Sequence, residues 1–486
     1  MALGYDAGES NRARADLGWG RQTPRDEDSL AKDSTRRLMR QKAADMRRNN
    51  PTVAGVCDRL ALWTVGEQGI MPQCKTTDRG WNKAAEQWWA QYGMTCDYRR
   101  RVSMWDFQNM AVSLRPTHGG MYFQLLEDGS IVPIECERVQ NPQDAERAKG
   151  WTDGVRVDKA TGRTLQYCVH SRGEDGTFSG RHKEQYIDSA NMLKVIRPLW
   201  RPDQVREIPD LAPILGALQD IDELNKYTLA TAKWQTTIVG FLSKIGGASP
   251  ISLPRGSNPT NTAGARPKYK TEWGEVLFGQ PGEEMKMLNS STPGANHIPH
   301  VKLQLALCAS ALSMPYEFFT LDLSGLDFSR QKGMLLLVNY AIRPWRRWLI
   351  DSFLSPLWNW RVSKAMGPKG ELSPAPSPGG VSEWSKVQWQ CPAEITIDRQ
   401  QDMQADMLEI QAGFLTLGQA TKRRGYDFEE QIDAKAQEQK MIEATAAKYK
   451  VDPSTLSKMQ IPGQTDATEQ ATATPTAVVE DGKEDE

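Results

Sequence analysis

The sequence predicts an α+β fold that is predominantly helical, and three observations lead to this prediction. Several long stretches carry apolar residues at helical spacing. Two pairs of short alternating runs flank turn-forming residues, as the strands of β-hairpins do. The 486 residues have the apolar content of an ordinary globular protein and are enough for two or three packed modules.

The N-terminal part predicts a series of helices. The charged, Ala-containing run from Asp26 to Met46 is typical of a helix. Pro51 opens a second helix that stops at Gly66, because proline is favoured at the first helical position and glycine just past the last. A third predicted helix carries Trp81 and Trp88, seven residues apart.

Strands are predicted next along the chain. The run MYFQLLEDGSIVPIECERV predicts two strands around a turn at Asp128 and Gly129. Residues 155–158 and 164–170 predict a second hairpin, and residues 192–196 a further strand. The helices and strands of this part together indicate a mixed α+β unit.

A second helical part begins after Pro209. Apolar residues recur there at helical intervals for roughly eight turns up to Gly246. Short strand-like pieces follow in PKYKTEWGEVLFGQPGEEMKML, and the helical spacing resumes from Val301 to Met314. The Pro/Gly/Ser-rich stretches 246–267 and 367–382 mark the edges of modules.

The segment from Tyr316 to Met366 joins the loop sequence LDLSGLDFS to one long predicted helix. A continuous helix from Ser329 to Met366 would extend on the order of 55 Å, which exceeds most compact domains. Pro344 and Pro356 predict bends. Such a helix suits an assembly, and two or three shorter core helices are the alternative. The apolar stripe consists of Leu337, Val338, Ala341, Trp345, Trp348 and Leu349.

The composition argues against several classes of protein. With 60 Lys and Arg against 61 Asp and Glu, tight binding of nucleic acid through bulk positive charge is not expected, so any DNA contact is loose or local. No window reaches the ~18 uncharged apolar residues of a membrane span, and the first 40 residues lack the apolar core of a signal peptide. The seven cysteines lie far apart without a CxxC, which predicts neither disulfides nor structural zinc.

The sequence shows no machinery for catalysis. No GxxxxGK[ST] loop is present to bind nucleotide phosphates. His297 and His300 lack a surrounding HExxH pattern, and GTFSG lacks the spacing of a nucleophile elbow. Asp203 and Glu207 faintly resemble a nuclease core, but Pro209 stands where its lysine is expected. We expect no catalytic residue, no metal site and no cofactor.

Basic triplets and tryptophans have more than one interpretation. The triplets 99–101 and 422–424 can contact phosphates, but such runs more often form solvated faces or salt bridges between subunits. The 16 tryptophans can stack on bases, but at helical spacing they more often anchor cores or interfaces. We favour interface anchors.

Four stretches, in this order, carry a family resemblance: RRNNPTVAGVCDRLALWTVGEQGIMPQ (47–73), RPDQVREIPDLAPIL (201–215), LDFSRQKG (326–333) and GFLTLGQATKRRGYDFEEQIDAKAQEQ (413–439). Together they resemble the lambda-type tailed-bacteriophage portal proteins, over most of residues 30–445. The chain departs from the family pattern at Arg206-Glu207, where Arg-Gly is usual. It departs again at Asp327-Phe328-Ser329, where a longer run of the Asn-Tyr-Ser-Ser type is usual.

The resemblance implies a ring of about twelve subunits around a DNA channel at one capsid vertex. It implies wing, stem, clip and crown regions in each subunit. The implied regions are a mobile arm (1–25), the wing (26–208), a stem helix (209–245), the clip (246–296), a second stem helix (297–315), the tunnel loop (316–330), a long bent wing helix (331–366), a linker (367–382), a helical crown (383–450) and a disordered tail (451–486).

The resemblance also implies a function and partners. Double-stranded DNA would be packaged and ejected through the ring without being read for sequence. The ring would dock the terminase large subunit during filling and head-completion or connector proteins afterwards, and would assemble with major capsid and scaffolding proteins. The protein would reside in the virion, and in the host cytoplasm during assembly. No membrane partner is implied.

Three sets of residues are candidates for these contacts. The DNA-facing tunnel loop would present Leu323, Ser324, Gly325, Leu326, Asp327 and Phe328. The partner-docking clip would present Lys268, Lys270, Glu272 and Trp273. The subunit interface would contain Trp345, Trp348, Arg343 and Arg347.

Two other functions remain as alternatives. One is a structural head or baseplate protein without a channel, whose long helices bridge neighbouring subunits. The other, less favoured, is a DNA-processing nuclease. Imaging of a ring with an axial opening and a magnesium-dependent cleavage assay distinguish these three readings.

Overall fold

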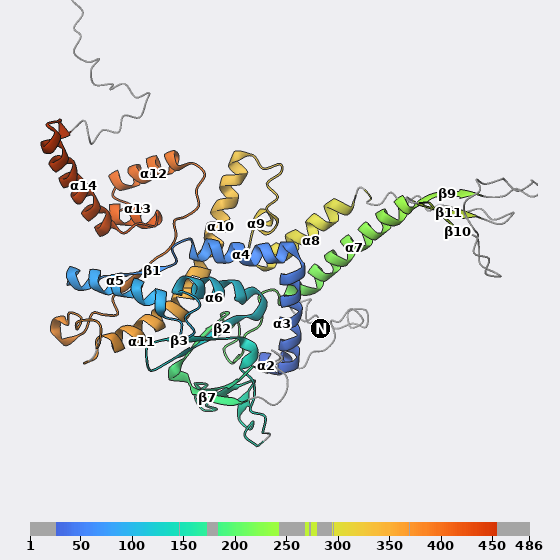
Figure 1. Cartoon of the computed structure of the whole chain (residues 1–486), viewed down its shortest axis with the longest axis horizontal. Helices are drawn as coiled ribbons and strands as arrows, with labels where there is room; N and C mark the ends of the chain where they lie inside the picture. The colour runs from blue at the N-terminus through green and yellow to red at the C-terminus, as the bar shows by residue number, and fades with distance from the viewer. Residues whose placement is uncertain are drawn as a thin grey trace, which may run out of the picture. The chain divides into compact units, whose positions relative to one another are not determined.

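The computed structural model describes residues 26–144, 146–172, 183–242, 268–271, 274–278, 294, 296–368 and 370–453. The expected arm at 1–25 and nearly all of the expected tail lie outside these residues. The chain divides into two compact units, Met1–Leu408 and Glu409–Glu486. Helices predominate in the described residues and occur with small sheets, which confirms the predicted α+β class (Figure 1).

The described chain opens with helices, as predicted. The Asn50 side chain accepts the amides of Thr52 and Val53 at 3.0 and 3.2 Å, so it caps the helix that Pro51 begins, and Gly66, with a φ of 72°, ends it. The sequence does not predict α6, because its apolar residues follow no regular stripe. The first helices are α2 (Glu27–Leu30), α3 (Asp33–Asn49), α4 (Pro51–Val65), α5 (Arg79–Thr95) and α6 (Met104–His118).

The strands that follow form two antiparallel sheets, with the orders β3-β2-β8 and β4-β5-β6-β7. Both predicted hairpins are confirmed, and Gly129 at the tip of the first has a φ of 88°. The elements are β2 (Gly120–Leu125), β3 (Ile131–Ile134), η2 (Cys136–Arg138), β4 (Trp151–Thr152), β5 (Val155–Val157), β6 (Thr164–His170), β7 (Glu184–Asp188), η3 (Ser189–Asn191) and β8 (Met192–Ile196).

Strand β2 is the layer between two hydrophobic cores. Met121, Phe123 and Leu125 belong to a core shared with the helices. Tyr122 belongs to a second core, which it shares with residues of the four-stranded sheet. Successive side chains of a strand point to opposite faces, so β2 is covered by helices on one face and by the second sheet on the other.

A long-range strand pair corrects one expected boundary. Strand β1 (Met71–Cys74) pairs antiparallel with β12 (Val387–Gln390), which follows the short helix η6 (Pro378–Gly380). The expectation of a helical crown over 383–450 is therefore wrong at its start, because residues 387–390 form a strand in the first unit. Neither strand has a local turn to predict the pairing.

A pair of helices extends away from these sheets (Figure 1). The predicted helix ends at Thr237, short of Gly246, because the β-branched and aromatic run Ile238–Leu242 forms a strand instead. The strand-like pieces predicted after it are confirmed by a small sheet of order β10-β11-β9. The elements are η4 (Ala212–Ile214), α7 (Leu215–Thr237), β9 (Ile238–Leu242), β10 (Lys268–Thr271), β11 (Gly274–Phe278) and α8 (His297–Ala311).

The long helix predicted after the loop is confirmed as one helical run with a wide turn inside it. Short helix α9 (Tyr316–Thr320) precedes the loop; α10 (Phe328–Leu349) then passes into the π-helical turn η5 (Ile350–Leu354) and on into α11 (Ser355–Ala365). The wide turn directly precedes Pro356, which lacks an amide hydrogen and crowds the turn before it. Helix α10 continues through Pro344 without a break.

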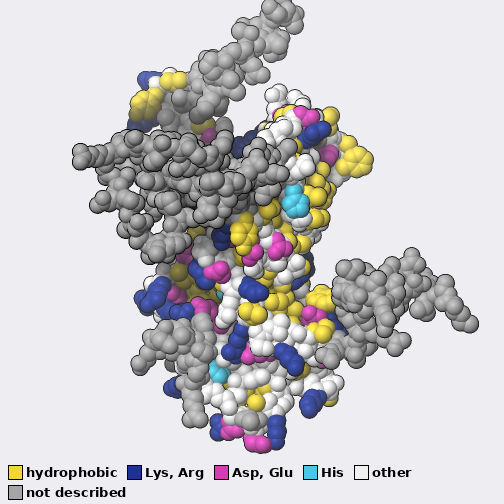
Figure 2. All heavy atoms as spheres, turned by 90° about the vertical axis from the view of Figure 1, so that its right-hand side faces the viewer, with side chains coloured by type: hydrophobic (Ala, Val, Ile, Leu, Met, Phe, Trp, Pro, Cys, Tyr) yellow, Lys and Arg dark blue, Asp and Glu magenta, His cyan; other side chains and the backbone are white. Residues whose placement is uncertain are grey.

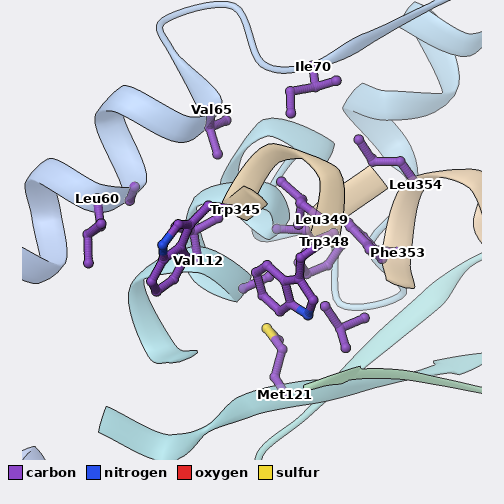
Figure 3. Packing of buried hydrophobic residues seen from close by; sticks show 14 of the residues in the cluster. Leu60, Val65, Ile70, Val112, Met121, Trp345, Trp348, Leu349, Phe353 and Leu354 are labelled. Atoms are coloured by element: carbon purple, nitrogen blue, oxygen red, sulfur yellow. The ribbon is translucent and has the colours of Figure 1, made fainter. Parts of the chain in front are cut away.

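The long helix supplies much of the larger core. Figure 3 shows its residues Trp345, Trp348 and Phe353 directed toward side chains of α4, α6 and β2. Phe353 stacks on Phe123 with ring centroids 4.4 Å apart. Full burial of one such side chain contributes about 1.5–3 kcal/mol, so this helix is a central support of the first unit.

Helices α13 (Leu417–Arg423) and α14 (Phe428–Tyr449) make up the described part of the second unit, and α12 (Arg399–Gln411) spans the boundary. Within that unit few apolar side chains are buried, and Phe414 is 85% exposed. None of the helices in the described ranges is both long and apolar enough to cross a bilayer.

Candidate functional site

The loop between α9 and α10 is built around Asp322. Its carboxylate accepts the backbone amide of Ser324 at 3.1 Å and also the hydroxyl of that serine. Its other oxygen accepts a hydrogen bond from Nζ of Lys302, on α8, at 2.9 Å. Hydrogen bonds from Ser324 and Lys302 lower the pKa of Asp322, so it is charged at neutral pH. The base of the loop is therefore ordered.

The tip of the same loop is open. Leu323, Ser324 and Gly325 are exposed, and Leu323 retains about half of its accessible surface. Gly325 has a φ of 78°, and a Cβ added there meets nothing within 4 Å. This conformation favours glycine for its backbone angle alone. The tip has both the space and the backbone freedom to move.

The loop ends where α10 begins. Asp327 caps the helix by accepting the amide of Arg330 at 2.8 Å. Phe328 and Asp327 are exposed, while Leu326 is half-buried and accepts a bond from Gln331. The structure thus brings all six residues predicted for this loop into one exposed connection.

The residues predicted for a subunit interface separate into two groups. Trp345 and Trp348 are buried in the first unit, with only 6% and 7% of their surface exposed. Arg343 and Arg347 lie at the surface, where they pair with Glu394 at 2.7 Å and with Asp351. The tryptophans pack in the core of the chain itself. Contact of Arg343 and Arg347 with another subunit stays a prediction.

A hollow of about 770 Å³ lies beside Trp345. On its wall, Arg115 places its guanidinium 3.8 Å from the Trp345 ring centroid and pairs with Asp210 at 3.0 Å. Burial lowers the pKa of Arg115 and raises that of Asp210, which the charges of Arg115 and Arg197 offset only in part. The hollow is also lined by the exposed Leu337 and Tyr340 of α10.

Exposed apolar side chains occur on α10 and on the two projecting helices, α7 and α8. Large hydrophobic residues on these three helices keep more than half of their surface accessible. Figure 2 shows hydrophobic side chains gathered in a band on one face, between charged ones. The exposed residues are Tyr227 and Leu229 on α7, Ile298, Leu303 and Leu307 on α8, and Leu336, Leu337 and Tyr340 on α10.

Of the four clip candidates, Lys268 and Lys270 lie on β10, opposite Leu277 and Glu275 of β11. Glu272 and Trp273 lie outside the described residues.

A buried cluster of charges, which the sequence does not predict, fixes α3 to the sheets. Glu207 is fully buried and accepts bonds from Arg40 at 2.5 Å, from Arg206 at 2.7 Å and from the Tyr122 hydroxyl at 2.8 Å. Nearby, Arg36 bonds the Asp153 carboxylate at 2.8 Å. The one signal in the sequence was the departure at Arg206-Glu207.

The charged state of this cluster follows from its pairing. Burial by itself raises the pKa of Glu207, but the charges of Arg206 and Arg40 and the hydrogen bonds outweigh burial and hold that pKa well below its usual 4.5. Glu207 is thus a charged counterion to two arginines, and its oxygens are occupied.

The geometry gives no support to the nuclease reading. Asp203 is exposed, whereas Glu207 is buried and paired, so the two carboxylates do not face a common site. In the described part of the chain no group of three or more His, Cys, Asp or Glu side chains is placed to hold a metal ion. Burial raises the pKa of Cys57, Cys74 and Cys96 to about 12, which leaves these thiols protonated and unreactive.

Comparison with known families decides the relationship. The family model described as phage portal protein, lambda family, matches residues 13–346, which is more than half of the chain. The chain belongs to the lambda family of phage portal proteins. This confirms the resemblance drawn from the sequence, and identifies a portal protein of a structural family. The comparison with curated proteins gave no match.

Similar chains occur in solved structures of gene transfer agent (GTA) particles. One, from the virion of a native GTA particle, is 12% identical with a TM-score of 0.38, and the match covers 78% of this chain and 91% of that one. A second, from the neck of a native GTA particle computed with C12 symmetry, is 12% identical with a TM-score of 0.37, and the match covers 81% of this chain and 98% of that one. A third, from the neck of an empty GTA particle computed with C6 symmetry, is 10% identical with a TM-score of 0.38, and the match covers 78% of this chain and 91% of that one.

Proposed function

We propose that this portal protein forms a closed ring at one vertex of a tailed-phage capsid, and that double-stranded DNA is packaged and ejected through its axial channel. The family membership supports the portal role. The observation that carries the ring is the exposed apolar surface of α7, α8 and α10, which no described residue of the chain covers. A head-to-tail contact whose rotation closes gives a cyclic oligomer, here of about twelve copies.

In this ring, residues 323–328 are the DNA-facing tunnel loop. The loop is exposed, and a Cβ added at Gly325 would meet nothing within 4 Å. It carries the acidic Asp327, with Asp322 just before it, rather than a cluster of cations. The whole chain has 60 basic and 61 acidic residues. Because DNA affinity rises with the number of phosphates neutralised, this balance suits a duplex that slides without being held.

Residues 246–296 are the clip, where Lys268, Lys270, Glu272 and Trp273 contribute to docking the terminase large subunit and later the head-completion or connector proteins. The major capsid and scaffolding proteins are the other partners, in the host cytoplasm during assembly and in the virion. Energy for translocation comes from the terminase, because the sequence offers no nucleotide-binding loop. Purified protein alone is expected to hydrolyse no ATP.

A packaging assay with purified terminase tests the role of the loop. Deletion of residues 322–328 is expected to leave rings that package little or no DNA, and imaging of the same preparation checks that the rings are intact. A matched variant replaces Leu323, Ser324 and Leu326 by glycine and keeps the loop length. If rings with the deletion package DNA as well as unaltered rings do, the DNA-facing role is refuted.

A further inference from the structure

The tunnel loop is bonded to a helix other than α9 and α10, the two helices that flank it. Lys302, on α8, donates from Nζ to Oδ2 of Asp322 over 2.9 Å. Among the residues that the structure describes, this is the one hydrogen bond or ion pair that joins residues 321–327 to an element other than the flanking helices α9 and α10. The other hydrogen bonds and ion pairs of the described loop residues lie within the loop or join it to α9 and α10.

Asp322 links this tie to the conformation of the tip. The carboxylate oxygen that is not bonded to Lys302 accepts the amide of Ser324, and the amide of Leu326 donates to the carbonyl of Leu323 at 3.3 Å to close the turn. A rotation of the Asp322 side chain away from Lys302 therefore removes the support of the turn as well. One ion pair controls both the base and the tip.

The two ends of the loop are fixed by different means. At the start, the amide of Leu321 donates to the carbonyl of Glu317 at 2.7 Å, and at the end Asp327 caps α10. These bonds use backbone and helix-capping groups, and they remain when Lys302 moves. Only the part between them depends on α8.

We propose that Lys302 is a positioning residue for the tunnel loop, which it holds in one orientation through Asp322 and releases when α8 shifts. This inference rests on the proposed function, because it concerns how the DNA-facing loop is controlled. The Lys302 side chain is 49% exposed and that of Asp322 27% exposed. Ion pairs this accessible to water are weak and screened by salt, so the tie is suited to opening and closing rather than to permanent attachment.

Through the position of Lys302 on α8, the ion pair connects the loop to the clip. Helix α8 starts at His297, directly after the clip region, and Lys302 is in its second turn. A partner that docks on the clip and displaces α8 therefore changes the distance between Lys302 and Asp322. In this way, events at the clip reach the loop through α8.

Hydrogen exchange of the full-length assembled protein, on the millisecond-to-second scale, tests the inference. Lys302→Gln removes the tie and keeps Asp322 and its bond to Ser324 available. The amide of Ser324 is expected to exchange roughly two- to fivefold faster, whereas the amide of Arg330, capped by Asp327, is unchanged. Lys302→Glu is expected to accelerate exchange further, and Lys302→Arg to restore the original rate.

Salt and a matched pair provide the controls. In the unaltered protein, exchange at Ser324 is expected to rise with salt concentration because the ion pair is screened, and in Lys302→Gln this dependence disappears. Lys226→Gln removes a comparably exposed pair, to Asp222 at 2.5 Å on α7, and leaves the loop unchanged. Equal exchange at Ser324 in Lys302→Gln and in the unaltered protein overturns the inference. That outcome is independent of ring formation, which imaging measures separately for the proposed function.

Discussion

The sheets and the projecting helices of this protein are stabilised in opposite ways. Around β2, apolar and charged side chains both find their partners within the chain. Both faces of the strand are buried, and even a charged side chain such as Glu207 is paired inside the fold. Along α7 and α8 the chain leaves large apolar side chains in water. The first region needs no other molecule, whereas the second is an incomplete surface that a further copy would complete.

This difference separates folding from assembly. Changes in the self-contained region are expected to lower the free energy of unfolding of the single chain. Changes on the exposed helices are expected to leave folding intact and to alter how copies associate. Each prediction below tests one side of this division.

The largest effect is expected from Glu207→Gln. The change leaves Arg40 and Arg206 without their shared counterion in a site closed to water. Loss of one partner of a buried ion pair costs about 3–5 kcal/mol, to be measured by urea unfolding of the full chain. The control Glu146→Gln removes an exposed pair with Lys149 and should leave the unfolding curve unchanged. A cost equal to that of the control would show that the buried cluster does not hold α3 to the sheets.

Acid should weaken the same region. The pKa of Glu207 is lower in the folded protein than its usual 4.5, so its contribution is fully present above that pH and is lost as the pH falls through the folded value. The free energy of unfolding is expected to decline below about pH 4.5, and less steeply in Glu207→Gln. Parallel pH curves for the two proteins would contradict the assignment.

On the exposed side, Leu337→Glu places a charge on the apolar face of α10. Leu337 is 59% exposed, so folding should be unaffected, but rings should need about tenfold more protein to form. Analytical ultracentrifugation measures both species. Leu38→Glu, at a similarly exposed leucine of α3, serves as the comparison. Assembly of Leu337→Glu at the original concentration would remove this face from the interface.

The smallest effect is expected at the tip of the tunnel loop. Gly325→Ala forces a side chain into a φ of 78°, at a local cost of about 1 kcal/mol. Because no atom lies within 4 Å of the added Cβ, no clash adds to this strain, so the free energy of unfolding should fall by no more than that amount, while the loop becomes stiffer. Packaging rate is the readout, and Ser324→Ala at the neighbouring position tests whether any substitution there has the same effect.

The sequence predicted what local signals encode. Pro51 and Gly66 bounded a helix, Asp128 and Gly129 marked a hairpin, and helical spacing identified the long helix. These features depend on neighbours a few residues apart, so one sequence suffices to reveal them.

Long-range partners were beyond the same reasoning. Nothing local indicates that Met71 lies opposite Gln390, or that Arg115 stacks on Trp345 and so keeps that indole inside the fold. The loop before α10 was predicted from its sequence, LDLSGLDFS, and its role as a tunnel loop is implied by the family resemblance. Its tie to Lys302 was not predicted, because it depends on a helix twenty residues earlier that returns beside it.

The most direct test of the account is electron microscopy of the purified full-length protein, with rotational symmetry counted from the images. We predict a closed ring with an open axial channel wide enough for duplex DNA. A particle that remains monomeric at every concentration, or that closes without an axial opening, would contradict the proposal that the exposed helices meet copies of themselves around a channel.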